Sequence, residues 1–149
     1  MTKIFAVIAI FLASIFGQHK NIVPVSQSST VTLDNKTFSV EVADTEADQE
    51  RGLSGHTPLS DNQGMLFVFS NPDNYGFWMK GMTFPLDIIW FDQNFRVVHI
   101  EKNLSPRTYP KIYYPGTNSV YVLEINAGQT DILKTKIGDL MAVSTSSLK

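Results

Sequence analysis

Apolar residues recur at every second position in the segment 37–43, TFSVEVA, where Phe38, Val40 and Val42 share one side of an extended chain. This two-residue period is typical of a β-strand with one buried face. The short apolar run VTL precedes the segment across the turn residues DN. This order predicts a β-hairpin at the start of the folded domain.

The most apolar part of the chain, residues 64–92, predicts the centre of the core. Within it, Leu86–Phe91 is almost continuously apolar, as expected for a central strand that is covered on both faces. Further short strands are expected at 64–69, 77–79, 95–101, 120–125 and 140–143, and loops at 56–63, 71–76 and 103–118.

Two short helices complete the predicted elements. Asp44 or Thr45 can cap a helix whose first turn is acidic, and the pair Arg51-Gly52 ends it. A second helix is expected around 130–135. The chain shows no internal repeat, so these elements predict one mainly β domain (β-rich α+β), either a barrel or a two-sheet sandwich of short strands with two short helices.

The first residues are typical of an export signal. Lys3 precedes the apolar run 4–16, which is shorter than the roughly 20 residues that a transmembrane helix needs. We therefore expect a signal peptide over residues 1–17, a polar tether over 18–30 and the domain over 31–149. The expected location is the periplasm or the exterior, without stable membrane insertion after cleavage. An uncleaved N-terminal anchor is the alternative.

Composition limits the chemistry that the chain can perform. It contains no cysteine, which excludes disulfides, thiolate nucleophiles and cysteine metal sites. His19, His56 and His99 follow no metal-ligand spacing, and no glycine-rich phosphate loop occurs, so the sequence predicts neither metal nor cofactor. The net charge of −2 provides no broad basic surface, and nucleic acid is therefore not an expected partner.

Several blocks of sequence carry a family resemblance. EVADTEADQERGLSG, GMLFVF, FWMKGMTFPLDIIWFD, VYVLEINAG and the turn IGD occur in this order within residues 38–143. They resemble the DUF192 (UPF0127) family, and the resemblance implies a β-rich, often exported protein of uncharacterised activity. The sequence departs from the family after Leu104, where SPRTYP replaces a loop that often carries a cysteine, and at Gly81, where asparagine is common. A role of that thiol cannot apply to this chain.

Charged residues in or beside the most apolar segments form the first candidate site. They are Arg51, Lys80, Asp87 and Glu124. A buried charge without a partner is strongly unfavourable, so we expect these side chains to be paired or gathered at a pocket. On the functional interpretation, Asp87 or Glu124 acts as a base while Lys80 or Arg51 binds an anionic ligand. The structural alternative is an internal ion pair, with a carboxylate that accepts hydrogen bonds from backbone N–H groups near Pro85.

The proline-interrupted loop at 103–118 is the second candidate site. Aromatic residues on a scaffolded loop are common in binding surfaces. The alternative is a loop that folds over the end of the barrel as a lid. Its candidate residues are Arg107, Tyr109, Tyr113 and Tyr114.

The aromatic residues of the apolar segments could instead form a platform for a sugar or another ring. Their positions inside predicted strands favour a place in the core. They are Phe77, Trp78, Trp90 and Phe91.

Three classes of function remain. The first, which the sequence favours, is an exported binding module of the cell envelope for a small molecule or glycan. The second is a carboxylate-based hydrolase that uses Asp87 or Glu124 with Arg51 or Lys80. The third is a structural or partner-binding domain without pocket chemistry. The sequence contains no nucleophile, metal or cofactor signature, which disfavours an enzyme.

Overall fold

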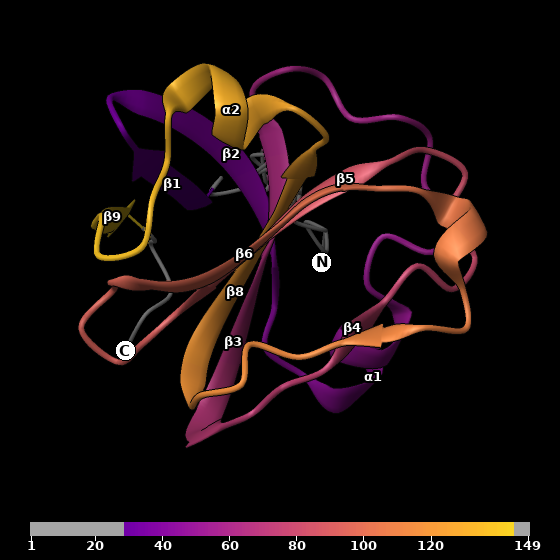
Figure 1. Cartoon of the computed structure of the whole chain (residues 1–149), viewed down its shortest axis with the longest axis horizontal. Helices are drawn as coiled ribbons and strands as arrows, with labels where there is room; N and C mark the ends of the chain where they lie inside the picture. The colour runs from indigo at the N-terminus through magenta and orange to yellow at the C-terminus, as the bar shows by residue number, and fades with distance from the viewer. Residues whose placement is uncertain (1–28, 145–149) are drawn as a thin grey trace, which may run out of the picture.

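The computed structural model describes residues 29–144 (Figure 1). The predicted signal peptide at 1–17 and most of the predicted tether at 18–30 lie outside the described residues. Within the described part of the chain, no helix is long and apolar enough to cross a membrane. The elements in chain order are β1 (Ser29–Leu33), β2 (Lys36–Ala43), α1 (Glu46–Arg51), β3 (Gln63–Asp73), β4 (Phe77–Trp78), β5 (Leu86–Phe91), β6 (Val97–Leu104), the 3-10 helix η1 (Pro106–Thr108), β7 (Ile112–Tyr113), β8 (Ser119–Asn126), α2 (Gln129–Leu133) and β9 (Met141–Ser144).

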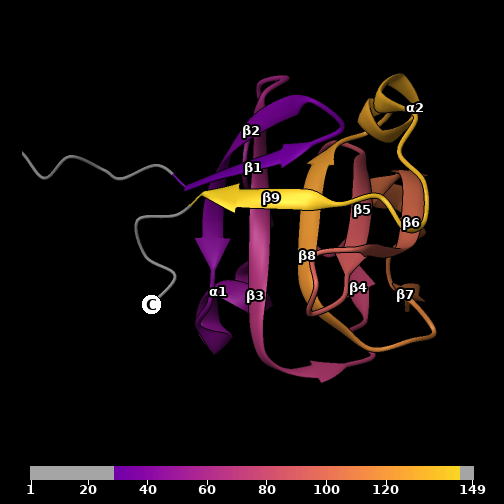
Figure 2. The ribbon, with the colours of Figure 1, turned by 90° about the vertical axis from the view of Figure 1, so that its left-hand side faces the viewer.

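Seven strands form one curled sheet in the order β6-β5-β8-β3-β2-β1-β9. Neighbouring strands are antiparallel except β2 and β3, which are parallel. Figure 2 shows β1 and β9 crossing in front of β3 and β8, so the sheet curls into a half-barrel. Its two edges meet at one end, where Arg96 bridges to Leu140 and the Val97 N–H donates to the carbonyl of Asp139 at 2.8 Å. The predicted mainly β fold is confirmed.

The two faces of this sheet carry separate apolar clusters. One cluster joins both edge strands, through Val97 of β6 and Met141 of β9, and therefore fills the inside of the curl. The other cluster lies on the opposite face, where the two-stranded ribbon β4–β7 contributes Phe77 and Tyr113. Every residue of β5 is buried, as predicted for a strand covered on both faces.

Local signals placed the first hairpin and the first helix correctly. Asp34 and Asn35 both adopt positive φ angles, +48° and +68°, which a tight two-residue turn requires. Thr45 caps α1, because its hydroxyl oxygen accepts a hydrogen bond from the Asp48 N–H at 3.2 Å.

Three predicted boundaries were wrong. β1 begins at Ser29, inside the predicted tether. β3 continues to Asp73, into the predicted turn at 71–76, because Asp73 pairs with Ser119 beyond a register shift. The predicted loop at 103–118 contains the end of β6, η1 and β7. The misplaced part of β3 is solvent-exposed, so no apolar alternation marks it as a strand.

Candidate functional site

A cavity of about 790 Å³ lies beside α1. Its lining comes from α1 and the turn after it, the middle of β3, the ribbon strand β4 with residues beside it, and β8. Aromatic rings form much of the wall, and Phe69 and Tyr75 stack with their centroids 3.6 Å apart. The aromatic residues of the lining are Phe67, Phe69, Tyr75, Phe77 and Trp78.

The end of α1 is shaped by a glycine. Gly52 has φ +49° and ψ −140°, a backbone conformation that only glycine adopts readily. The turn lets the buried Leu53 pack into the core directly after the exposed Arg51. A Cβ atom at position 52 would lie 3.4 Å from the Phe67 ring in the cavity wall. Gly52 therefore ends α1 and also forms part of the cavity wall.

Glu124 contributes the one buried carboxyl of the cavity lining. On β8 it lies opposite Met65 of β3 and Ile88 of β5, so apolar strands flank it on both sides. Glu124 is 5% exposed, and its Oε2 atom is buried without a hydrogen-bond partner among residues 29–144. Burial raises the pKa of Glu124 to about 8, because an apolar setting disfavours the charged form.

This pKa gives Glu124 an uncommon chemistry at neutral pH. A carboxyl with a pKa of about 8 is mostly protonated there, so it offers an O–H donor as well as a carbonyl acceptor. The terminal torsion of a glutamate is broad, so the carboxyl group can turn to meet a ligand.

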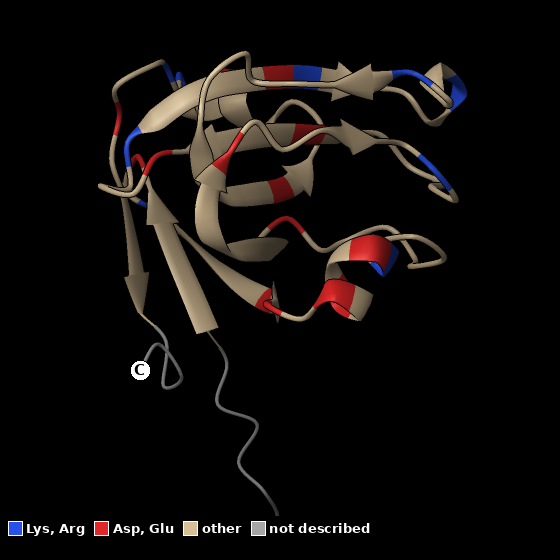
Figure 3. Ribbon diagram, turned by 90° about the horizontal axis from the view of Figure 1, so that it is seen from below, with Lys and Arg blue, Asp and Glu red and all other residues tan. Residues whose placement is uncertain are grey.

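The two cations predicted for this site both line the cavity but lie at its exposed rim. Arg51 forms an ion pair with Asp48 of the same helix at 2.7 Å, and Lys80 places its Nζ 5.2 Å from the centroid of the Trp78 ring. Figure 3 shows that the charged residues of α1 are mostly acidic. Two of them also belong to the lining, and they offset the two cations: Glu46 and Glu50.

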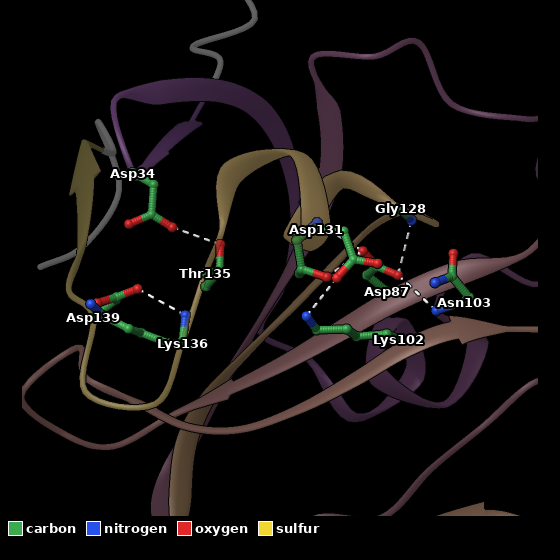
Figure 4. Close-up of polar contacts among 10 residues, drawn as sticks. Asp34, Asp87, Lys102, Asn103, Gly128, Asp131, Thr135, Lys136 and Asp139 are labelled. Carbon is green, nitrogen blue, oxygen red and sulfur yellow. Dashed lines mark hydrogen bonds and ion pairs between the residues drawn. The ribbon is translucent and has the colours of Figure 1, made fainter.

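Asp87, the fourth predicted residue, does not line the cavity. It is buried on β5 and accepts four hydrogen bonds from neighbouring turns (Figure 4). Its Oδ1 accepts from the backbone N–H groups of Asn103 and Gly128, and its Oδ2 accepts from the N–H and hydroxyl of Thr130 at 2.9 and 2.7 Å. Asp87 thus holds the start of α2 against the end of β6. Its backbone N–H bonds match one part of the structural alternative, but the internal ion pair that was also expected does not form at Asp87 among the described residues.

The structure therefore brings Arg51, Lys80 and Glu124 to one cavity and leaves Asp87 apart. Strand register gives the reason. Ile88 lies opposite Glu124, whereas Asp87 lies opposite Ile125, and successive side chains of a strand point to opposite faces. The two carboxyl groups are thus separated by the sheet.

The predicted binding-loop residues are also separated by the fold, because one of them is buried and the other three are exposed. Tyr113 is buried, because its place on β7 opposite Phe77 directs it into the core. Tyr109 and Tyr114 are exposed, as is Arg107, whose backbone N–H is capped by Ser105.

Sequence reasoning missed two features of this region. Trp78 is exposed, although its strand position suggested the core, and its ring meets the Tyr109 ring edge-on at 5.9 Å. Phe69, at the end of the predicted strand 64–69, and Tyr75, within the predicted turn 71–76, both line the cavity. Tyr75 follows β3 closely, and its hydroxyl donates to the Asn71 carbonyl at 2.7 Å. The sequence signal that could have revealed this part of the cavity is the pair of aromatic residues, Phe69 and Tyr75, on either side of the polar segment 70–74. Among residues 29–144, no three His, Asp or Glu side chains are grouped to hold a metal ion.

Comparison with known proteins gives the family of the chain. Residues 14–143 match DUF192, described as an uncharacterized ACR. The chain belongs to the DUF192 family. Several solved structures are similar in fold to this chain, and two of them have the same TM-score. One is a protein of unknown function from Novosphingobium aromaticivorans, with 36% identity and a TM-score of 0.71 over 80% of this chain and 89% of that one.

The other solved DUF192-like structure is described as a candidate transcription regulator from Sinorhizobium meliloti. It has 28% identity and a TM-score of 0.71, over 80% of this chain and 96% of the other. A search of curated proteins gave no match to this DUF192 chain.

Proposed function

We propose that this DUF192 chain is a small-ligand binding module and that the ligand occupies the cavity beside α1. One observation carries the proposal: Glu124 belongs to the lining of an aromatic-walled cavity, and its buried Oε2 atom has no hydrogen-bond partner in the described part of the chain. A buried polar atom without a hydrogen bond costs about 1–3 kcal/mol, and a ligand that supplies the missing partner recovers this energy. The cavity volume of about 790 Å³ falls within the usual range for small-molecule sites.

The rim of the cavity favours an uncharged ligand. Arg51 and Lys80 are offset by Glu46 and Glu50 in the same lining, and Arg51 is already paired with Asp48. Protonated Glu124 adds no charge at neutral pH. The ligand would therefore combine an apolar or ring-shaped face with a hydroxyl, carbonyl or ether oxygen that can pair with Glu124.

The geometry gives less support to a carboxylate hydrolase. Hydrolysis of a glycosidic bond commonly uses two carboxyl groups that flank the bond in one site. Asp87 and Glu124 lie on opposite faces of the sheet, and Asp87 already accepts four hydrogen bonds. Binding is the better-supported function.

Export belongs to the proposal and rests on the apolar run 4–16 behind Lys3. We infer that the protein acts in the periplasm or outside the cell after removal of residues 1–17. N-terminal sequencing of secreted protein tests this inference. A mature chain that still begins at Met1 or Thr2 would contradict cleavage.

A thermal-shift screen of uncharged small molecules, followed by calorimetry on variants, tests ligand binding. Hits should bind the wild type at about pH 6 and lose about tenfold in affinity at about pH 10, where Glu124 has lost its proton. Glu124→Gln keeps a neutral donor and acceptor, so it should bind at both pH values. Glu124→Leu should bind at neither.

The exposed Glu41 provides a matched control, because it lies outside the cavity lining. Glu41→Gln should bind like the wild type. Hits that bind Glu124→Leu with unchanged affinity would place the ligand elsewhere and refute the proposed site.

A further inference from the structure

Four large apolar side chains are exposed together on and beside the ribbon β4–β7. Their exposed fractions are 43%, 46%, 41% and 52% for Trp78, Tyr109, Ile112 and Tyr114. Trp78 lies opposite Ile112 in the ribbon, and the neighbouring pair is Phe77 with Tyr113. Successive side chains of a strand point to opposite sides, so Trp78 and Ile112 face away from this buried pair. We call these four residues the ribbon surface. Exposed apolar groups gathered in this way mark a surface that meets a ligand or partner.

The backbone is adapted to this arrangement at Gly76. A Cβ atom there would lie 2.5 Å from Cε1 of Tyr114 and 2.7 Å from Cγ2 of Ile112, closer than real contacts allow. The missing side chain thus lets both residues lie across the start of β4.

The ribbon surface is continuous with the cavity of Glu124. Trp78 belongs to both, and its neighbours Gly76 and Lys80 also line the cavity. A ligand larger than the cavity would therefore extend from Glu124 across the rim onto Trp78 and Tyr109, whose rings already meet edge-on.

We propose that the ribbon surface binds a carbohydrate chain whose terminal unit occupies the Glu124 cavity. The inference rests on the proposed function and names its ligand class. Sugar rings present C–H faces that pack on aromatic rings, and hydroxyls that both donate and accept hydrogen bonds. The proposed site offers both kinds of contact, because its exposed aromatic rings can pack on the C–H faces and the neutral Glu124 carboxyl can pair with a hydroxyl.

Other occupants fit less well. A nucleic acid requires basic surface, whereas the chain has a net charge of −2. An apolar protein surface would cover Trp78 but leave the buried Glu124 Oε2 atom without a partner among the described residues.

The two tryptophans of the chain provide the assay. Trp90 is fully buried and Trp78 is 43% exposed, so iodide in solution can quench only Trp78 directly. Cellohexaose, chitohexaose and maltohexaose are each titrated into the full mature chain, beside glucose and N-acetylglucosamine. At least one hexasaccharide should shift the emission to shorter wavelength, protect it from iodide, and bind about tenfold tighter than its monosaccharide.

Variants then separate the ribbon surface from the cavity. Tyr109→Ala and Ile112→Ala should reduce hexasaccharide affinity toward the monosaccharide value. Glu124→Leu should weaken both sugars. Ile132→Ala, which removes an exposed apolar side chain on α2, is the matched control and should change neither.

Two results would overturn the inference. One is that no hexasaccharide binds tighter than its monosaccharide; if a small molecule from the screen still binds through Glu124, the proposed function stands alone. The other is that Trp78 becomes protected from iodide as protein concentration rises without sugar, which would assign the ribbon surface to a second copy of the chain. If Glu124→Leu binds a hexasaccharide with unchanged affinity, the sugar contacts the ribbon surface but does not enter the cavity.

Discussion

Asp87 and Glu124 lie one register step apart on adjacent strands, yet their carboxyl groups point to opposite faces of the sheet. One accepts four hydrogen bonds, and the other has a buried oxygen with no partner among the described residues. Two buried acids on neighbouring strands are thus expected to change the stability of the fold in opposite directions. Asp87 is expected to stabilise the fold, whereas Glu124 is expected to weaken it in exchange for a chemically usable group.

The first prediction concerns Asp87. Asp87→Asn replaces one acceptor oxygen with an NH2 group that faces other donors, the Asn103 and Gly128 N–H groups or those of Thr130. We expect a loss of about 2–4 kcal/mol in the free energy of unfolding, measured by urea denaturation. Asp61→Asn, on an exposed loop residue, is the control. A loss below about 1 kcal/mol would show that the network contributes little.

The second prediction is a pH dependence of stability caused by Glu124. Its pKa is about 8 in the folded protein and about 4.5 in the unfolded chain. Below pH 4.5 both states hold the proton, and the burial of the neutral carboxyl is least unfavourable. As pH rises toward 8, only the unfolded chain releases the proton, so unfolding becomes easier. The full loss is on the order of 5 kcal/mol and is complete above the folded pKa.

Glu124→Gln removes this titration. The variant should gain stability relative to the wild type between about pH 5 and pH 9, by several kcal/mol in total, as measured by urea unfolding at each pH. Glu124→Leu also lacks the titrating group, so it should show the same dependence even if its absolute stability differs. Parallel curves for wild type and Glu124→Gln would mean that Glu124 ionises normally.

Much of the fold could be predicted from the sequence, because its signals are local. Alternation identified β2, continuous apolar sequence identified β5, and the capping pair Asp44 and Thr45 marked the start of α1. The strand order and the curl could not be predicted, since they depend on pairings between distant segments such as β1 with β9.

The candidate site was predictable only in part. Apolar context correctly suggested that Asp87 and Glu124 are buried. Which face each residue occupies depends on strand register, and the sequence does not specify the register of β5 against β8. The ribbon shows the same limit: Trp78 and Tyr113 lie on short, unremarkable strands, and only their pairing partners decide that one is exposed and the other buried.

The third prediction concerns the turn that ends α1. Gly52 occupies a region of φ and ψ that is strained for any residue with a Cβ atom, so Gly52→Ala should cost on the order of 1–3 kcal/mol in the free energy of unfolding. Gly116→Ala is the matched control: φ is also positive there, at +70°, and the space around a new Cβ atom is open. Thermal unfolding of both variants checks the prediction. Equal losses would show that the positive φ shared by both glycines sets the cost, and that the conformation and surroundings of Gly52 add nothing to it.

The last prediction concerns the environment of the exposed tryptophan before any ligand is added. Lys80 holds its ammonium group 5.2 Å from the Trp78 ring, whereas Trp90 is fully buried and donates its Nε1–H to the Tyr75 carbonyl at 2.9 Å. A nearby cation attracts anions, so iodide should quench the protein emission more strongly than caesium does. Trp78→Phe should abolish most of the quenching, and Trp90→Phe should leave it in place. Lys80→Gln should bring iodide and caesium closer together, and an iodide preference that survives this substitution would assign the local field to other groups.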